Sequence, residues 1–139
     1  MRALSIRQPY AELILRGLKT IEYRSRPTHI IGERFYIYAS KGNGISFGPS
    51  RHRATPRSAW SHDLANADPP PPPWMLELAH ALVLGELPVG VIVGSAIVEK
   101  VSPPDPSDGM YRWHLADVQR ARKLRRPNGR PQPVWFMPF

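Results

Sequence analysis

Residues 3–24, ALSIRQPYAELILRGLKTIEYR, change their hydrophobic period twice and carry most of the information about the fold. Residues 3–6 alternate apolar and polar side chains, as a half-buried strand does. Pro9 fits the first position of a helix because the N–H that it lacks has no partner there, so we expect a helix over about residues 9–16. Residues 19–24 alternate with period two, which is typical of a strand. The sequence therefore predicts a strand, a helix and a second strand in succession.

Charged side chains mark the second of these strands. It contains the pattern Gly-x-Lys-x-x-Glu-x-Arg, whose charged members are Lys19, Glu22 and Arg24. Such a group can hold an anionic or carbonyl-bearing ligand, and burial of Lys19 or crowding by Arg7 and Arg24 would disfavour its ammonium form. We therefore take Lys19, Glu22 and Arg24 as the candidate catalytic residues. The alternative is an ion network that only pins the helix to the sheet.

The remaining elements follow from runs of β-branched, aromatic and other apolar residues. Four further strands are predicted, at residues 34–40, 89–101, 111–115 and 134–139. Gly90 and Gly94 in the second of these runs are typical of sharp bends and favour a curled sheet. A basic stretch separates the last two strands. A helix is expected near residues 74–84, deeply packed because it is apolar nearly all round.

At 139 residues the chain has the length of a single domain. The composition shifts at about residues 42–73, where nearly half of the residues are Gly, Pro or Ser. Residues 69–73 are a proline run, which must be extended, and Thr55 and Pro56 are typical of the start of a short helix. We interpret this region as an insertion over the core.

The balance of charge favours a polyanionic partner. The chain has 19 Lys and Arg residues against 11 Asp and Glu, a formal net charge of +8. Most of these cations are arginine, which contacts phosphate through two N–H groups and stacks on bases. The alternative is that the charge only keeps a small protein soluble.

Candidate binding residues come from cationic clusters and aromatic side chains. One cluster consists of Arg51, Arg53 and Arg57, and a second of Arg120, Arg122, Lys123, Arg125 and Arg126. Either could follow an RNA backbone, while Tyr10, Trp60 or Trp113 could stack on unpaired bases. A solvated surface and core aromatic residues are the alternatives.

Several classes of protein are disfavoured. The absence of cysteine excludes disulfides, thiolate nucleophiles and cysteine metal sites, and the five histidines have no i, i+4 pairing, so we expect no metal and no cofactor. No apolar run approaches the ~18 residues that a membrane span needs. The first residues lack the apolar stretch of a secretory signal. We therefore expect a cytoplasmic protein without a membrane partner; the sequence specifies no oligomeric state.

Five motifs together resemble the ASCH family, small intracellular domains related to the PUA barrels that bind RNA. They are Ser5-Ile6-Arg7-Gln8-Pro9-Tyr10, the Lys-Glu-Arg pattern, Ala39-Ser40-Lys41, the Gly-Val-Ile-Val-Gly at 90–94, and Tyr111-Arg112-Trp113. The resemblance covers most of the chain except about residues 42–73. It implies an α+β fold, a PUA-like curled mixed β-barrel of about five or six strands with flanking helices. It also implies that the first helix lies beside a cleft containing the Lys-Glu-Arg strand.

The resemblance implies an RNA- or nucleotide-binding protein, acting in RNA processing or regulation, with RNA, a nucleoside or a nucleotide as its partner. The residues expected to bind this ligand are Arg7, Gln8, Tyr10, Ser40, Lys41, Trp113, Arg122, Arg125 and Arg126. Some ASCH relatives are amidohydrolases that remove the acetyl group of N4-acetylcytidine with a lysine, a threonine and a glutamate. Lys19 matches the lysine, Glu22 stands at the threonine position, and Glu99 is a guess for the glutamate. A hydrolase centred on Lys19, either an amidohydrolase or a ribonuclease, is therefore the alternative.

Overall fold

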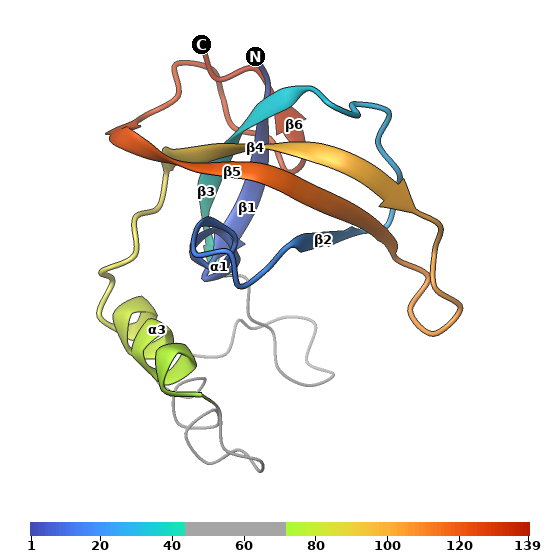
Figure 1. Ribbon diagram of the computed structural model, residues 1–139. Helices are drawn as coiled ribbons and strands as arrows, with labels where there is room; N and C mark the ends of the chain where they lie inside the picture. The colour runs from blue at the N-terminus through green and yellow to red at the C-terminus, as the bar shows by residue number, and fades with distance from the viewer. Residues whose placement is uncertain (44–71) are drawn as a thin grey trace.

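The computed structural model describes residues 1–43 and 72–139. Figure 1 shows one curled sheet of six strands with two helices among the described residues. The elements in chain order are β1 (Ala3–Gln8), α1 (Tyr10–Leu15), β2 (Ile21–Arg24), β3 (Arg34–Asn43), α3 (Pro73–Val83), β4 (Val91–Ser102), β5 (Tyr111–Arg125) and β6 (Trp135–Phe136). None of these helices is long and apolar enough to cross a membrane. The predicted α+β class and the curled mixed sheet are confirmed.

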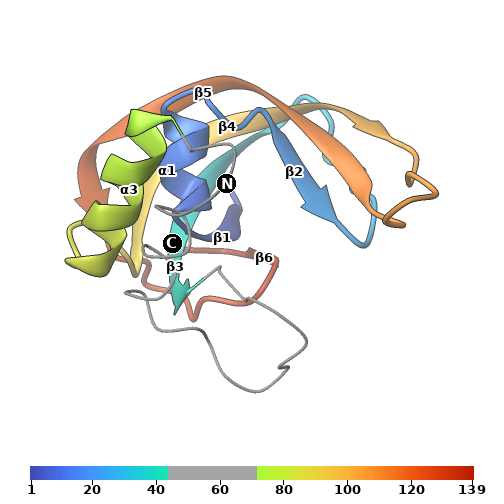
Figure 2. The same cartoon turned by 90° about the horizontal axis from the view of Figure 1, so that it is seen from below.

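The strand order of the sheet is β2-β5-β4-β3-β1-β6. The pair β1 and β3 is parallel and every other pair is antiparallel, so the sheet is mixed. Figure 2 shows β4 and β5 arching over α1, and the two views place β2 and α3 on opposite sides of the molecule. Because the sheet curls, β2 at one end of the strand order approaches β1, which is four strands away in that order.

The core lies between the concave face of the sheet and α1. Its buried side chains come from α1 and all strands except β2 and β6, and include Ile6, Ile14, Phe35, Val98 and Trp113. Gly94 allows the closest approach, since a Cβ there would lie 2.4 Å from the carbonyl oxygen of Gln119 and 2.6 Å from a methyl carbon of Leu15. The register of β4 also shifts between Ile92 and Gly94. The curled sheet that this glycine favours is confirmed, and the pairing of β4 with β5 is irregular here.

The basic stretch after residue 115 is not a connection between strands, as we expected, but the second half of β5. Ala116, Gln119, Arg120 and Arg125 all pair with residues of β4. The backbone hydrogen bonds to β4 make the strand, while most side chains in this half stay exposed to water and so show no apolar alternation. The predicted strand of residues 111–115 is therefore ten residues too short at its end.

Two further expectations about helices are wrong. Pro9 precedes α1 instead of beginning it: it follows a cis peptide bond, and the helix starts at Tyr10. The expected deep packing of α3 is also wrong, because Leu78 is its only buried side chain among those described. Apolar side chains of this helix are instead exposed to water, as at Leu76, which is 37% exposed. Most of the predicted insertion, with the expected helix at Thr55 and the cations at residues 51–57, lies outside the described residues.

Candidate functional site

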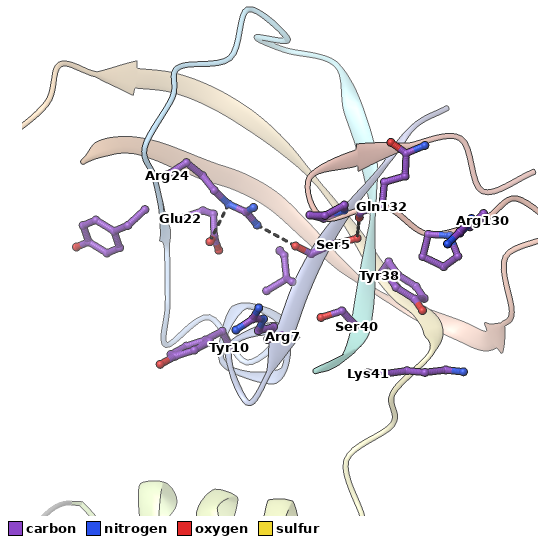
Figure 3. A pocket seen from close by; sticks show the side chains of 14 residues that line it. Ser5, Arg7, Tyr10, Glu22, Arg24, Tyr38, Ser40, Lys41, Arg130 and Gln132 are labelled. Atoms are coloured by element: carbon purple, nitrogen blue, oxygen red, sulfur yellow. Dashed lines mark hydrogen bonds and ion pairs between the residues drawn. The ribbon is translucent and has the colours of Figure 1, made fainter. Parts of the chain in front are cut away.

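A cavity of about 710 Å³ opens between β1, β2, the end of β3 and the segment before β6 (Figure 3). It forms where the curl of the sheet brings the N-terminal strand, β2 and a C-terminal segment together. The residues that line it are Ser5, Ile6, Arg7, Tyr10, Glu22, Tyr23, Arg24, Tyr38, Ser40, Lys41, Arg130, Pro131, Gln132 and Pro133. Six of the twelve predicted site residues are among them.

Glu22 and Arg24 of β2 form the charged part of the cavity wall. The Arg24 Nε lies 3.2 Å from a carboxylate oxygen of Glu22, and the Arg24 guanidinium donates a hydrogen bond of 2.9 Å to the backbone oxygen of Ser5. The pairing of β2 with β5 fixes the backbone from which both side chains extend. The bond to Ser5 joins β2 to β1, which are not neighbours in the sheet. The ion pair of the alternative interpretation is thus present, but both side chains also line the cavity.

Trp113 supports this arginine from behind. The indole is only 2% exposed, and its N–H donates a hydrogen bond of 3.0 Å to the backbone oxygen of Arg26. The Arg24 guanidinium lies 5.8 Å from the ring centroid of Trp113, within the range of a cation–π contact. Trp135 stacks on Trp113, at 5.8 Å between ring centroids. Trp113, which we expected to stack on a base, does not line the cavity and instead holds Arg24 in place.

Lys19 lies behind Glu22 and does not line the cavity. Its ammonium is 3.4 Å from a carboxylate oxygen of Glu22, contacts the backbone oxygen of Ile21, and lies 5.3 Å from the ring centroid of Tyr23. Burial lowers the pKa of Lys19 below 10.5; the charge of Glu22 opposes this shift, and the charge of Arg24 adds to it. Lys19 therefore acts on the cavity only indirectly, through its contacts with Glu22 and Tyr23 in the wall.

Tyr23 is a wall residue that sequence reasoning did not single out. Its ring is 45% exposed and has the Lys19 ammonium and the Arg112 guanidinium each 5.3 Å from its centroid. Arg112 is itself held by Asp108 at 3.2 Å and by Asp105 at 3.6 Å, both in the loop between β4 and β5. The only signal in the sequence was an aromatic residue within the Lys-Glu-Arg strand, since the loop aspartates have no regular spacing to Tyr23.

The opposite end of the cavity combines hydroxyl and cationic groups. Tyr38, Ser40 and Lys41 follow one another along β3, and Arg130 lies beside them in Figure 3. Ser40 and Lys41 were expected here, but Tyr38 and residues 130–133 were missed. Prolines around residue 131 predict an extended loop without indicating what it lies against.

Besides Trp113, four predicted binding residues lie outside the cavity lining. Gln8 is 1% exposed and structural: it donates to the backbone oxygen of Pro88 and accepts from the backbone N–H of Glu12, each at 3.0 Å. Arg122, Arg125 and Arg126 are exposed at the far half of β5 and its end, and none lines the cavity. The Arg125 guanidinium lies 3.8 Å from the ring centroid of Phe139.

Glu99, the candidate for the remote glutamate, contributes nothing to this cavity. Glu99 is exposed on β4 and is not part of the lining. Within residues 1–43 and 72–139, no group of three or more His, Asp or Glu side chains lies close enough together to hold a metal ion.

The lining of the cavity offers hydrogen-bond donors and acceptors, positive charge and aromatic side chains.

Comparison with known proteins agrees with this architecture. The family model of the ASCH domain matches residues 4–127. A crystal structure of ASCH from Zymomonas mobilis is similar in fold, with a TM-score of 0.55 and 15% sequence identity over 98% of this chain and 85% of that one. No protein with a curated function matches the sequence. Because the family model spans most of the chain and the curled sheet agrees with it, this chain belongs to the ASCH domain family, a PUA-like fold associated with RNA binding.

Proposed function

We propose that this ASCH domain binds RNA or a nucleotide in the cavity between β1, β2 and residues 130–133, and that it acts in RNA processing or regulation. The observation that carries the proposal is the pair of Glu22 and Arg24 side by side in the wall of a cavity with exposed aromatic rings. Ligand-binding cavities span ~300–1,000 Å³, and the volume of about 710 Å³ lies in this range. A base with its sugar has room to enter.

The chemistry of the wall suits an unpaired base. The Glu22 carboxylate accepts hydrogen bonds and the Arg24 guanidinium donates them, and the two lie 3.2 Å apart. The edge of a base carries donors and acceptors side by side, so one base can contact both groups. Tyr10 and Tyr23, 37% and 45% exposed, offer ring faces for stacking. A single-stranded nucleic acid or a free nucleotide is therefore the favoured ligand.

Fluorescence anisotropy of a labelled single-stranded RNA and of a tRNA, at about 50 and 200 mM salt, tests this proposal. We expect binding that weakens as salt rises, because phosphate contacts release counterions. Tyr23→Ala should weaken binding by about tenfold or more, since a stacked base contributes ~1–3 kcal/mol. The control is Leu18→Ala, which truncates a side chain that is 48% exposed and lies outside the cavity lining. No binding of either RNA at low salt would remove RNA as the ligand, and no binding of nucleosides and nucleotides as well would remove the whole proposal.

An amidohydrolase is the second candidate, favoured by the lowered pKa of Lys19 beside Glu22. On N4-acetylcytidine, water would attack the acetyl carbon, the carbon–nitrogen bond would break, and acetate and cytidine would leave. Glu22 lines the cavity and would take the proton of the attacking water, with Lys19 acting through it. Binding ranks first because Lys19 itself does not reach the cavity.

Chromatography of N4-acetylcytidine after incubation with the protein tests this second candidate. Release of cytidine that is lost in Lys19→Ala, with unchanged folding, supports it. An absence of turnover by the wild type overturns it and leaves the binding proposal intact. The same incubation with labelled RNA on a denaturing gel tests the ribonuclease alternative, which fails if the RNA keeps its length.

A further inference from the structure

The two ends of the cavity differ in charge. At the β2 end, Arg24 and, behind the wall, Lys19 are each within 3.4 Å of the Glu22 carboxylate, so their charge is partly compensated. Among the described residues that line the cavity, Glu22 is the only acid. At the other end, Lys41 and Arg130 are exposed cations with no ion pair to a carboxylate in the described part of the chain. An anion is therefore attracted more strongly at the end of Lys41 and Arg130, where no carboxylate offsets the positive charge, than at the end of Glu22.

Lys41 is supported by the turn that leads into β4. A Cβ on Gly90 would lie 3.0 Å from the Lys41 Cε and 3.6 Å from its Cγ, so the stem of the lysine passes over this glycine. Gly90 has a φ of +74° and donates a backbone hydrogen bond of 2.6 Å to Ala39. The turn thus needs a glycine for its backbone, and the missing side chain leaves the space that the lysine stem occupies.

Arg130 begins a segment that is fastened to β1. Ser5 donates its backbone N–H to the backbone oxygen of Val134 at 2.9 Å, and its hydroxyl contacts the backbone oxygen of Gln132. On the other side, Gly129 donates a backbone hydrogen bond of 2.9 Å to Pro138. The segment between these anchors lines the cavity, so Arg130 extends from a backbone that is held at both ends.

Tyr38 lies between these cations in Figure 3, and Ser40 lies beside it. Tyr38 is 4% exposed, and burial raises the pKa of its phenol, which keeps the hydroxyl protonated and able to donate. Ser40 lines the same part of the cavity. Hydroxyl donors beside lysine and arginine are a common way of binding phosphate oxygens.

We propose that the end of the cavity formed by Tyr38, Ser40, Lys41 and Arg130 binds the phosphate group of a nucleotide whose base lies against Glu22 and Arg24. The ligand thus has one orientation, and a phosphorylated nucleotide binds more tightly than its nucleoside. This inference rests on the proposed function and deepens it: it assigns a phosphate subsite and separates nucleotides from nucleosides as the ligand class.

Titration of the full chain, followed by two-dimensional amide NMR because that method measures weak binding, tests the orientation. The probes are the four common ribonucleosides, their 5′-monophosphates and their 3′-monophosphates. We expect at least one monophosphate to bind about tenfold more tightly than its nucleoside, the effect of one further hydrogen bond between charged groups. The 5′ and 3′ series distinguish which side of the nucleotide carries the bound phosphate.

A double variant, Lys41→Gln with Arg130→Gln, removes the cations and keeps polar side chains. It should abolish the preference for the monophosphate and leave nucleoside affinity within about twofold, because the base-binding end is unchanged. The matched control is Arg26→Gln with Lys100→Gln, which removes the same charge from exposed residues outside the cavity lining and should keep the preference. Circular dichroism confirms that both double variants fold.

The outcomes separate the two proposals. Equal affinity for nucleoside and monophosphate overturns the phosphate subsite while the binding of RNA can still stand. A preference that survives in Lys41→Gln with Arg130→Gln overturns it too, since the phosphate is then bound elsewhere. A failure of RNA, nucleosides and nucleotides alike to bind removes the proposed function, and the subsite with it.

Discussion

Two buried glutamates in this protein each contact two cationic side chains, but only one of them can be reached by a ligand. Glu12 in α1 lies 3.0 Å from Arg16 and 2.8 Å from Arg120, and Glu22 in β2 lies 3.4 Å from Lys19 and 3.2 Å from Arg24. The two residues are 6% and 9% exposed. Only Glu22 lines the cavity. An acid with two cations is thus not in itself a functional signature, because its meaning depends on whether a ligand can reach it.

The Glu12 cluster fastens α1 to the sheet. Arg120, on β5, donates hydrogen bonds of 2.8 and 3.1 Å to the two carboxylate oxygens of Glu12. Burial alone would raise the pKa of Glu12, but the hydrogen bonds from Arg120 and Arg16 outweigh it and hold that pKa below 4.5. We therefore expect this cluster to govern stability and the Glu22 cluster to govern binding.

The largest effect should come from Glu12→Ala. Loss of charged hydrogen bonds from a buried acid should lower the free energy of unfolding by about 2 kcal/mol, which is reduced from the value for fully buried pairs because Arg120 stays half exposed. Urea unfolding measures this. RNA affinity should stay within about twofold at a temperature where the variant is folded. A folded Glu12→Ala variant that no longer binds RNA would contradict the division of roles.

Low pH should weaken the same cluster by protonating Glu12. Because the pKa of Glu12 is below 4.5 in the folded protein, its contribution to stability is complete above about pH 5 and is lost as the pH falls through the folded pKa. Urea unfolding from about pH 6 down to pH 3 should show a steeper loss in the wild type than in Glu12→Gln. Parallel curves for the two proteins would mean that Glu12 does not carry this dependence.

Exchanging arginine for lysine in each cluster sharpens the comparison. Arg24→Lys keeps the charge but loses the planar fork and the contact with Trp113, and should weaken RNA binding by about tenfold. Arg16→Lys makes the same change in the Glu12 cluster and should leave RNA affinity unchanged. Anisotropy titrations of both variants measure the difference. Equal losses would show that binding responds to general destabilisation.

From Lys19 we expect stability to depend on pH in the alkaline range. Because burial lowers its pKa below 10.5, the unfolded chain keeps this proton to a higher pH than the folded protein does. Stability should therefore rise as the pH climbs from the folded pKa toward 10.5. Urea unfolding of the wild type and of Lys19→Gln between about pH 7 and pH 10 isolates this part, which the variant should lack.

The smallest effect should come from the residues that support Tyr23. Arg112→Leu removes the cation on one side of the ring and should weaken RNA binding by about two- to fivefold, since an exposed cation–π contact is worth ~0.5–1 kcal/mol. Asp108→Asn, which frees Arg112 without removing it, should have a smaller effect in the same direction. If Arg112→Leu binds as the wild type does, Tyr23 needs no support from this loop.

The local sequence pattern predicted the positions of most helices and strands well, but it predicted the burial of their side chains poorly. The strand, helix and strand of residues 3–24 follow from the change of period, and the curled sheet agrees with the glycines in the apolar run that became β4. The second half of β5 was missed because its side chains are charged and exposed, while its stability comes from backbone pairing with β4. The burial of α3 was mispredicted for the opposite reason, since the side chains of an apolar helix need not be buried.

The site was predictable where it is local in sequence. Glu22 and Arg24 are two residues apart on one strand, so alternation alone places them on one face. Tyr38 and Arg130 were missed because their place depends on the parallel pairing of β1 with β3 and on contacts between residues 5 and 134. Trp113 was misjudged because an aromatic residue in a strand has the same pattern whether it faces the core or a ligand.

Ser5 joins three parts of the chain that are distant in sequence. Its backbone oxygen accepts from Arg24, its backbone N–H donates to Val134, and its hydroxyl contacts Gln132. The walls of the cavity therefore separate only when bonds at this one residue break. Hydrogen–deuterium exchange at the Ser5 amide would report that opening directly, and an occupant touching both walls would slow the exchange by trapping the closed form.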